Sequence, residues 1–438
     1  MAAIYGGDEV NAVVLDLGTW QTKAGYAGDD TPKAVFPSLA GVVANSAAAN
    51  GMEVDGQQQQ QQQQQGRKLF YGSQELGYKR PDMEVVSPFT ADGLLGDWEI
   101  TQQLWKYALR ERLHIDPREN AVLLAEPTHN SREVREKTVQ AAFEHLGCPA
   151  LFLAKDAVLA TFSVAKQTSV VVDAGYGCTT VAGVHDGYVL TKSVSRSPVG
   201  GRLLNSCLQK AMEARGSQLR PRQTFKRVEK KGFPGEFDVL PAPDAAGLTT
   251  SFLAHQLELI VGDIKELVSR VSDVHFVEAD NLTVPAITYE LPDGNEIQVG
   301  VDRFKVPELL FQPQLVRSFP GMADHPLPDG LKGLAGLVVD SVNRCDTDVR
   351  KDLYQHVVLV GGTSLLTQMR ERLELDISAA APGGTKVKVT APVNPTERRH
   401  AVWIGGSILA SLGSFQQMWM SKQEYEEHGP GLIHRKAP

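Results

Sequence analysis

The sequence predicts an α/β fold in which two lobes enclose a nucleotide-binding cleft, and three stretches of the chain lead to this prediction. Residues 13–16 and 170–173 are apolar, β-favouring runs that each end in an aspartate, and each is followed by a glycine-containing turn and a returning strand. Residues 357–360 are a third apolar strand, which ends in Gly-Gly-Thr. Three strand-to-glycine junctions, spread over the chain, are what a cleft between two lobes requires.

The chemistry of these turns suits a polyphosphate. A turn with Asp, Gly and Thr offers backbone N–H groups to a phosphate oxygen, and its carboxylate can hold a hydrated divalent metal. One such turn alone is more often an ordinary hairpin turn. Two turns that face each other could grip one polyphosphate, and the Gly-Gly-Thr junction would let a flat base lie against the backbone.

Length, charge and cysteines restrict the function further. A chain of 438 residues is long enough for at least two compact lobes. Its net charge of −8 argues against gripping duplex DNA over the whole surface. The four cysteines are scattered and form no C-x-x-C motif, which argues against a zinc site or a disulfide framework. No secretory signal is recognisable and no apolar run approaches the roughly 18 residues of a membrane span, so we expect a soluble intracellular protein.

The first part of the chain alternates strands and helices. Residues 34–37 predict a short edge strand that its proline closes, and residues 121–125 a buried strand. Residues 97–113 carry apolar side chains at helical spacing, and Ser131 is a candidate cap for a second helix. Between these elements, residues 44–66 consist mostly of Ala, Asn, Gly and a glutamine tract, and we expect a polar surface loop of little structure there.

The second part predicts mostly helices. Asp156 to Val164 is expected to be a helix at a hinge between the lobes. Residues 201–278 are expected to form helices that a basic, proline-bearing loop at 220–231 interrupts. Residues 288–297 predict a hairpin around Asp-Gly. Residues 401–412 predict a helix rich in small residues, which could pack in the core or admit a partner helix.

Six segments of the chain are distinctive: Lys-Ala-Gly-Tyr-Ala-Gly-Asp-Asp at 23–30, Tyr-Glu-Leu-Pro-Asp-Gly at 289–294, Arg-Lys-Asp-Leu-Tyr at 350–354, Trp-Ile-Gly-Gly-Ser-Ile-Leu-Ala-Ser-Leu at 403–412, Phe-Gln-Gln-Met-Trp at 415–419 and Lys-Gln-Glu-Tyr at 422–425. In these segments the chain resembles the actin family, and the resemblance covers nearly its whole length. The resemblance implies the two-lobed ATPase fold of duplicated RNase H-like domains with four subdomains. Residues 1–163 and 401–438 would form the small lobe, and residues 164–400 the large lobe.

The resemblance also implies a site for ATP and Mg²⁺ or Ca²⁺. Asp16 and Asp173 would hold the hydrated metal. The groups expected at the phosphates are Lys23 and the backbones of Gly18, Thr19, Gly175 and Gly177. Those expected at the adenosine end are Lys265, Glu266, Gly361, Gly362, Thr363 and Arg399.

Several positions depart from the actin pattern. Trp20 replaces a small glycine in the first turn, Tyr176 replaces an aspartate in the second, and Leu366 replaces a tyrosine under the base. Asp156 and Thr180 stand where actin has the glutamine and histidine that orient the attacking water. Because hydrolysis needs a water held in line and a path for its proton, we expect very slow or no hydrolysis.

Within the family, the opening residues 5–10, the rewritten loop and the altered turns are most similar to nuclear actin-related proteins, which are subunits of chromatin-remodelling and histone-acetyltransferase complexes. The resemblance implies a nuclear site, pairing with actin on a helical scaffold segment, possible contact with histones, and no membrane partner. The groove for that helix would be lined by Phe162, Ile404, Ile408, Leu409, Leu412 and Met418, for which simple core packing is the other reading.

Two other functions remain open from the sequence. The first is a filament-forming ATPase of the cytoskeleton, although the polar loop at 44–66 is unsuited to a dry contact between subunits. The second is a sugar or metabolite kinase of the same superfamily, against which the actin-like carboxy-terminal segments argue.

Overall fold

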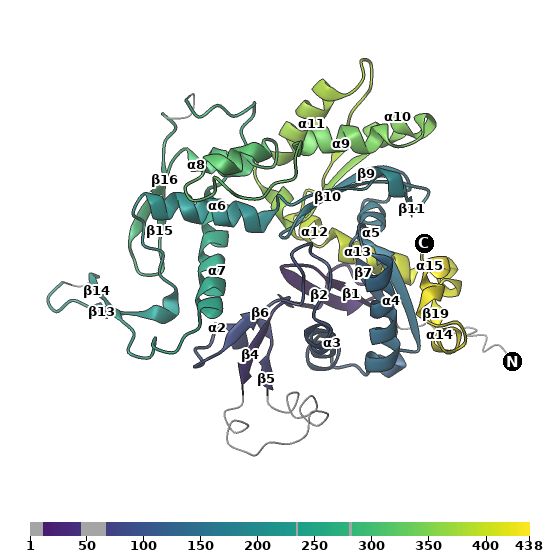
Figure 1. The fold of residues 1–438 in the computed structure, drawn as a ribbon, viewed down its shortest axis with the longest axis horizontal. Helices are drawn as coiled ribbons and strands as arrows, with labels where there is room; N and C mark the ends of the chain where they lie inside the picture. The colour runs from purple at the N-terminus through teal and green to yellow at the C-terminus, as the bar shows by residue number, and fades with distance from the viewer. Residues whose placement is uncertain (1–11, 45–66, 234, 280–282) are drawn as a thin grey trace.

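Two six-stranded sheets organise the described part of this computed structural model, which comprises residues 12–44, 67–233, 235–279 and 283–438 (Figure 1). Residues 45–66, which make up nearly all of the expected glutamine-rich loop, and the opening residues 5–10 lie outside this part. The first sheet contains, in spatial order, β19 (Met420–Ser421), β8 (Ala150–Lys155), β7 (Ala121–Glu126), β1 (Ala12–Leu17), β2 (Gln21–Tyr26) and β3 (Ala34–Pro37). The second contains β11 (Tyr188–Val189), β10 (Thr179–His185), β9 (Ser169–Ala174), β17 (Val357–Val360) and β18 (Val389–Thr390), with β12 (Ser195–Ser197) paired to β10.

The two sheets repeat one plan. Each begins with an antiparallel hairpin, β1–β2 or β9–β10, and each adds two parallel strands beside the first strand of that hairpin, β7 and β8 or β17 and β18. A further antiparallel strand, β3 or β12, pairs with the second strand of the hairpin. The duplicated α/β fold expected from the sequence is therefore confirmed.

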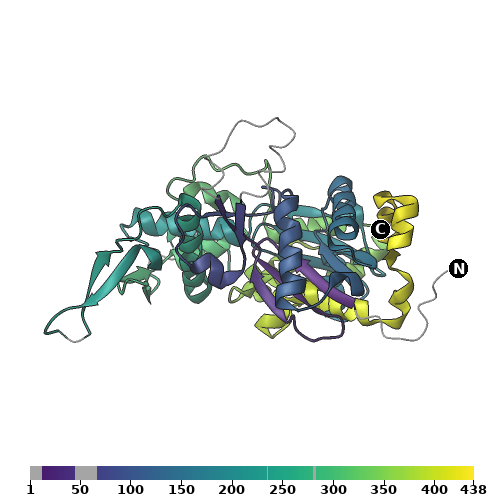
Figure 2. The same ribbon diagram turned by 90° about the horizontal axis from the view of Figure 1, so that it is seen from below.

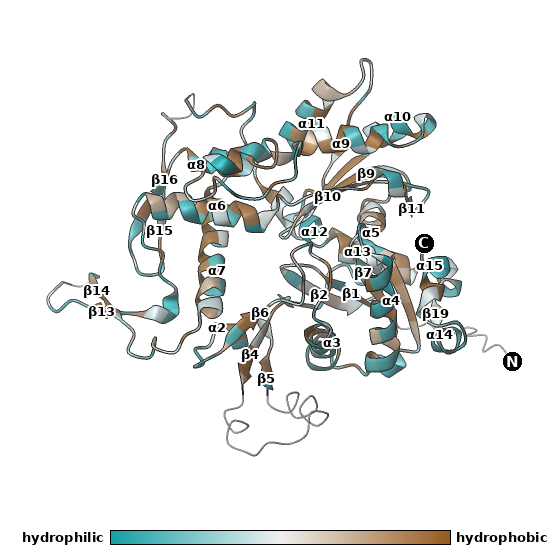
Figure 3. Ribbon diagram, in the orientation of Figure 1, coloured by the Kyte–Doolittle hydropathy of each residue, from teal (hydrophilic) through white to brown (hydrophobic). Residues whose placement is uncertain are grey.

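Helices cover both sheets. The helices that accompany the first sheet are α3 (Trp98–Lys106), α4 (Arg132–Ala141), α13 (Ala401–Ser411), α14 (Lys422–His428) and α15 (Ile433–Lys436). Those that accompany the second are α5 (Asp156–Ser163), α6 (Gly201–Ala214), α7 (Thr250–Val268), α8 (Asp302–Glu308), α9 (Leu334–Asn343), α10 (Thr347–Gln355), α11 (Met369–Ala380) and α12 (Pro395–Arg399). Figure 3 shows hydrophilic residues along the outward-facing α4 and α10, as expected for amphipathic outer helices.

The predicted helix ends have identifiable caps. Asp97 accepts a hydrogen bond from the backbone N–H of Ile100 at the start of α3, and Ser131 accepts one from Val134 at the start of α4. The helix expected over 97–113 is α-helical only to Lys106 and continues as a π-helical turn over Tyr107–Arg112.

Each sheet has its own apolar core. Of three clusters of buried side chains in the described residues, the first draws its members from positions 170–389 and the second from 12–159 and 403–437. The third and smallest joins α5 and Ala401 to strands of the second sheet. The carboxy-terminal segment returns to the first sheet, where the indole N–H of Trp403 donates to the carbonyl of Val14 at 3.0 Å. We call the unit around the first sheet the small lobe and the unit around the second the large lobe, and the boundaries given above stay a prediction.

Helices α5 and α13 cross where the lobes meet. Gly405 allows this close approach, since a Cβ at that position would lie 1.8 Å from the carbonyl oxygen of Leu159. The small side chains within residues 401–412 thus allow α13 to pack closely against α5 inside the molecule.

Small sheets extend from both lobes. They are β4 (Ala40–Ala44), β5 (Arg67–Phe70) and β6 (Glu84–Val86) beside α2 (Gly72–Gly77), the hairpin β13 (Phe225–Glu229) with β14 (Phe237–Pro241), and the hairpin β15 (Ile287–Glu290) with β16 (Glu296–Val299). The hairpin β13–β14 projects from the body of the molecule (Figure 2). The prediction of a loop at 220–231 was therefore wrong in part: exposed, alternating charged residues hid a strand there.

Candidate functional site

A cavity of about 290 Å³ lies between the two sheets, at the turns that follow β1, β9 and β17. Most of the predicted nucleotide residues line it, namely Asp16, Gly18, Thr19, Lys23, Asp173, Gly175, Lys265, Glu266, Gly361, Gly362, Thr363 and Arg399. Gly177 lies at its edge, where it contacts Thr19. The topology explains this convergence, because β1 and β9 are equivalent central strands whose carboxyl ends carry equivalent turns.

The first turn is built by the β1–β2 hairpin. Asp16 lies opposite Lys23 in the register of these strands, and the Lys23 Nζ atom donates to Asp16 Oδ2 at 2.9 Å. Both side chains are largely buried. A lysine and an aspartate are thus held together at the floor of the cavity, where phosphate oxygens and a cation could both be bound.

The second turn is built by the β9–β10 hairpin. The Gly175 N–H donates to the carbonyl of Cys178 at 3.1 Å, which closes the turn. The Gly177 N–H donates to Thr19 Oγ1 at 3.0 Å, so this amide is engaged by the first turn. Two of the amides that the sequence suggested for phosphate binding therefore already have partners within the protein.

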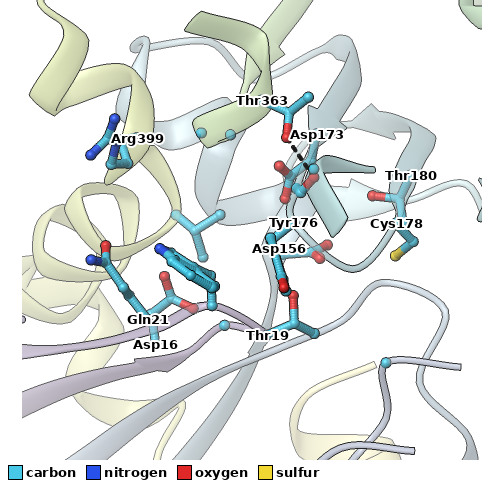
Figure 4. A pocket seen from close by; sticks show the side chains of 18 of the residues that line it. Asp16, Thr19, Gln21, Asp156, Asp173, Tyr176, Cys178, Thr180, Thr363 and Arg399 are labelled. Carbon is cyan, nitrogen blue, oxygen red and sulfur yellow. Dashed lines mark hydrogen bonds between the residues drawn. The ribbon is translucent and has the colours of Figure 1, made fainter. Parts of the chain in front are cut away.

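The third junction follows β17. Because β17 runs parallel to β9 with Val360 opposite Asp173, Gly361 comes directly beside that aspartate. Thr363 lies in the 3₁₀ turn that begins at Gly362 after β17, and its Oγ1 donates to the carbonyl of Gly175 at 2.8 Å (Figure 4). The second and third junctions are thus fixed to one another.

The large lobe supplies the charged groups at the other end of the cavity. Lys265 of α7 is 7% exposed, and its Nζ donates to the carbonyl of Gly201 at 3.3 Å. Burial lowers the pKa of Lys265 to about 8. Glu266 forms an ion pair with Arg399 of α12 at 3.2 Å, and both side chains are partly exposed at the cavity rim.

Carboxylates gather at the phosphate end. Asp16, Asp156 and Asp173 all lie around the pocket (Figure 4). Burial raises the pKa of Asp173, with a further rise from Asp16, and burial also raises the pKa of Asp156, with a further rise from Asp173. Within the described residues no three His, Cys, Asp or Glu side chains are grouped closely enough to hold a metal directly.

The contacts of Asp156 were not predicted from the sequence. Its Oδ1 accepts from the backbone N–H of Thr128 at 3.0 Å, from the Thr128 hydroxyl, and from the N–H of Ala157 at 2.6 Å. Thr128 comes from the loop after β7, and nothing in the local sequence pattern pointed to it. One oxygen of this carboxylate is therefore fixed in place between Thr128 and the first turn of α5.

The two aromatic departures contact each other. The rings of Trp20, in the first turn, and Tyr176, in the second, are 4.6 Å apart between centroids and inclined by 41°. The Tyr176 hydroxyl donates to Glu258 at 2.8 Å, and the same carboxylate accepts from the amide of Asn205 at 2.5 Å. Glu258 and Asn205 lie on α7 and α6, and no sequence pattern indicated their role.

The expected partner groove is exposed at its outer end. Ile408, Leu412 and Met418 are each more than a third exposed. Ile404 and Leu409 of α13 are half-buried against the core of the small lobe, and Phe162 of α5 is also half-buried. The outer three side chains are therefore surface residues, and Leu412 lies just past the end of α13.

No described helix is both long and apolar enough to cross a lipid bilayer.

Comparison with known proteins agrees with this geometry. Residues 7–438 match the family model described as Actin. The chain is 48% identical to "Actin-related protein 4" of Oryza sativa subsp. indica over 454 residues, covering 99% of this chain and 100% of that protein. It is 48% identical to "Actin-related protein 4" of Arabidopsis thaliana over 445 residues, with the same coverage, and 36% identical to "Actin-related protein 4" of Yarrowia lipolytica over 434 residues, covering 99% and 97%. The chain belongs to the actin family.

Proposed function

We propose that this chain is a structural, ATP-binding subunit of nuclear chromatin-remodelling and histone-acetyltransferase complexes, and that it hydrolyses ATP very slowly or not at all. The observation that carries the proposal is a cavity between two lobes that keeps the charged groups for a nucleotide, while Asp156 and Thr180 stand in place of the water-orienting glutamine and histidine. Membership of the actin family supports nucleotide binding in general. ATP, the metal and the complex are the parts that we propose.

The residues at the phosphate end fit a hydrated divalent cation. Mg²⁺ is commonly held through one or two carboxylates, phosphate oxygens and several waters, which suits Asp16 and Asp173 without a third protein ligand. A cation between Asp16 and Asp173 would relieve the repulsion between these two like charges. Bound Mg²⁺ or Ca²⁺ would neutralise phosphate charge, while Lys23 and Lys265 provide the fixed positive charges of the protein.

Hydrolysis is disfavoured by what replaces the water-orienting groups. Asp156 is engaged by Thr128 and by the start of α5, so its bonded oxygen cannot also hold a water in line. Thr180 is buried opposite Asp173 in the β9–β10 register, and a threonine hydroxyl is a poor acceptor of a proton at neutral pH. Bound ATP would instead stabilise the closed arrangement of the two lobes.

A single-turnover assay tests this part of the proposal. The purified chain is mixed with a substoichiometric amount of ATP labelled at the γ-phosphate, and bound ATP and free phosphate are followed for hours. Binding of nearly all the added ATP with almost no phosphate release is expected. Rapid release together with sedimentable polymer would instead support the alternative, a filament-forming ATPase of the cytoskeleton.

The surface formed by Ile408, Leu412 and Met418 is the proposed seat of a scaffold helix that also carries actin. A helix with apolar residues at i, i+3, i+4 and i+7 would cover these side chains and the half-buried ones behind them. The variants Ile408→Asp and Leu412→Asp place a charge in this surface. Leu375→Asp, which changes an exposed leucine of α11, serves as the matched control.

Affinity capture of the tagged full-length chain from nuclei separates the outcomes. Wild type and Leu375→Asp are expected to recover actin together with a remodelling or acetyltransferase scaffold subunit, and the two groove variants are expected to lose both. Equal recovery by all four chains would refute the groove. Recovery of no such subunits by wild type would refute the nuclear assignment and the complex, and histone recovery in high salt tests direct contact with histones.

A further inference from the structure

The two lobes contact each other directly at the phosphate end of the cavity. Trp20 belongs to the β1–β2 turn of the small lobe and Tyr176 to the β9–β10 turn of the large lobe, and their rings are 4.6 Å apart. The Tyr176 hydroxyl is fixed by Glu258, and this carboxylate is in turn held by Asn205. The large-lobe half of the contact is therefore oriented by hydrogen bonds within the large lobe.

A hydrogen bond beside the rings joins the same two turns. Thr19 Oγ1 accepts the Gly177 N–H at 3.0 Å, and a Cβ on Gly177 would lie 3.0 to 3.3 Å from three atoms of the Thr19 side chain. The turns are thus in van der Waals contact. A phosphoryl group could reach the Gly177 amide only by displacing Thr19.

A third contact lies farther along the same edge. Asp92, in the small-lobe loop before α3, forms an ion pair with Arg196 of β12 at 3.1 Å. The carbonyl of Asp92 is also within 3.3 Å of His129 Nε2, which holds the loop to the small lobe. An aromatic contact, a hydrogen bond and an ion pair therefore connect the two lobes directly.

We propose that Trp20 and Tyr176 are specificity-determining residues that make this site bind an adenosine diphosphate about as tightly as the triphosphate. The inference rests on the proposed nucleotide site and names its ligand class more closely. In a cleft that is held shut by the terminal phosphate, loss of that phosphate lowers the closed population and weakens binding. Here the aromatic pair and the Thr19–Gly177 bond maintain closure, so the terminal phosphate adds little.

Cys178 provides a reporter of closure that needs no nucleotide. Its side chain lines the cavity beside the second turn and is half-buried, whereas Cys148, Cys207 and Cys345 are buried. The rate at which a thiol reagent modifies Cys178 in the nucleotide-free full-length chain, located by mass spectrometry, measures opening of the lobes. Trp20→Ala is expected to raise this rate roughly two- to tenfold, the factor that corresponds to loss of one aromatic pair.

Further variants distinguish loss of the Trp20–Tyr176 contact from general destabilisation of the fold. Tyr176→Ala and the double variant should give the same rate as Trp20→Ala, since either change removes the whole contact. Tyr176→Phe keeps the ring and loses only the bond to Glu258, and a smaller increase is expected. Tyr188→Ala, which removes an exposed tyrosine of β11, is the matched control and should leave the rate unchanged.

Calorimetric titration with ADP and ATP, each with Mg²⁺, tests the selectivity. Wild type is expected to bind the two with dissociation constants that differ by less than roughly threefold. In Trp20→Ala the ADP affinity should fall more than the ATP affinity, by roughly the same two- to tenfold factor as the labelling rate.

Wild-type binding that is tenfold or more tighter for ATP, or a labelling rate that Trp20→Ala leaves unchanged, would overturn the inference. Failure of wild type to bind either nucleotide would overturn the proposed function and the selectivity with it. The labelling comparison would then still show whether the aromatic contact holds the lobes together.

Discussion

Replacing Gly361 with alanine tests how the third strand-to-glycine junction is built. Gly361 has φ 91° and ψ 156°, a backbone conformation that is essentially restricted to glycine and costs other residues about 1–3 kcal/mol. A Cβ there would lie 2.4 Å from both the carbonyl oxygen of Ala174 and Asp173 Oδ1, and overpacking of this kind costs about 1–3 kcal/mol more. Gly361→Ala should therefore lower the free energy of unfolding by about 4 kcal/mol, the middle of the summed range.

The measurement is urea unfolding followed by circular dichroism, with nucleotide titration of the folded variant. Gly383→Ala is the control, because a Cβ at Gly383 meets nothing within 4 Å. Since the added methyl group displaces Asp173, nucleotide affinity should fall together with stability. An unfolding free energy within about 1 kcal/mol of the Gly383→Ala value would refute the reasoning, because either cost alone exceeds or equals that difference.

Two further predictions concern buried charges of the large lobe. Burial lowers the folded-state pKa of Lys265 from its ordinary value of 10.5 to about 8, so its charged form opposes folding. This penalty, about 3 kcal/mol, is fully present below pH 8 and is lost as the pH rises from about 8 to 10.5. The stability gap between wild type and Lys265→Met, measured by urea unfolding, should narrow between pH 8 and 10, and a constant gap would contradict the assignment. Glu308 and Arg372 form an ion pair that is almost wholly buried, so Glu308→Gln should destabilise the chain by about 3–5 kcal/mol. Glu371→Gln, which breaks the exposed pair with Arg370, should cost less than about 1 kcal/mol, and similar losses in the two variants would show that burial is not the cause.

Local patterns were sufficient to predict the strands and turns around the cavity. The apolar runs that end in Asp16 and Asp173 form equivalent hairpins, because strand propensity and a glycine turn are properties of neighbouring residues. The Asp-Gly hairpin at 288–297 was predicted correctly for the same reason, with Gly294 at φ 90°.

What the sequence did not reveal depends on contacts between distant segments. The bond from Thr128 to Asp156 joins the loop after β7 to the start of α5, and the contact of Trp20 with Tyr176 joins two lobes. The spacing of residues along the chain carries no information on such pairs. The hairpin at 225–241 was missed because its side chains are mostly exposed on both faces, so the alternation of apolar and polar residues that marks a strand is absent.

The central claim is that the cavity holds an adenine nucleotide that the protein does not consume. Mass spectrometry of the nucleotide that copurifies with the full-length chain from its own cells, in amounts compared with the protein, tests this claim most directly. The account predicts close to one adenine nucleotide per chain, unchanged in its phosphate content after hours of incubation. A chain that carries no nucleotide, or one whose bound ATP disappears into ADP and phosphate within minutes, would contradict it.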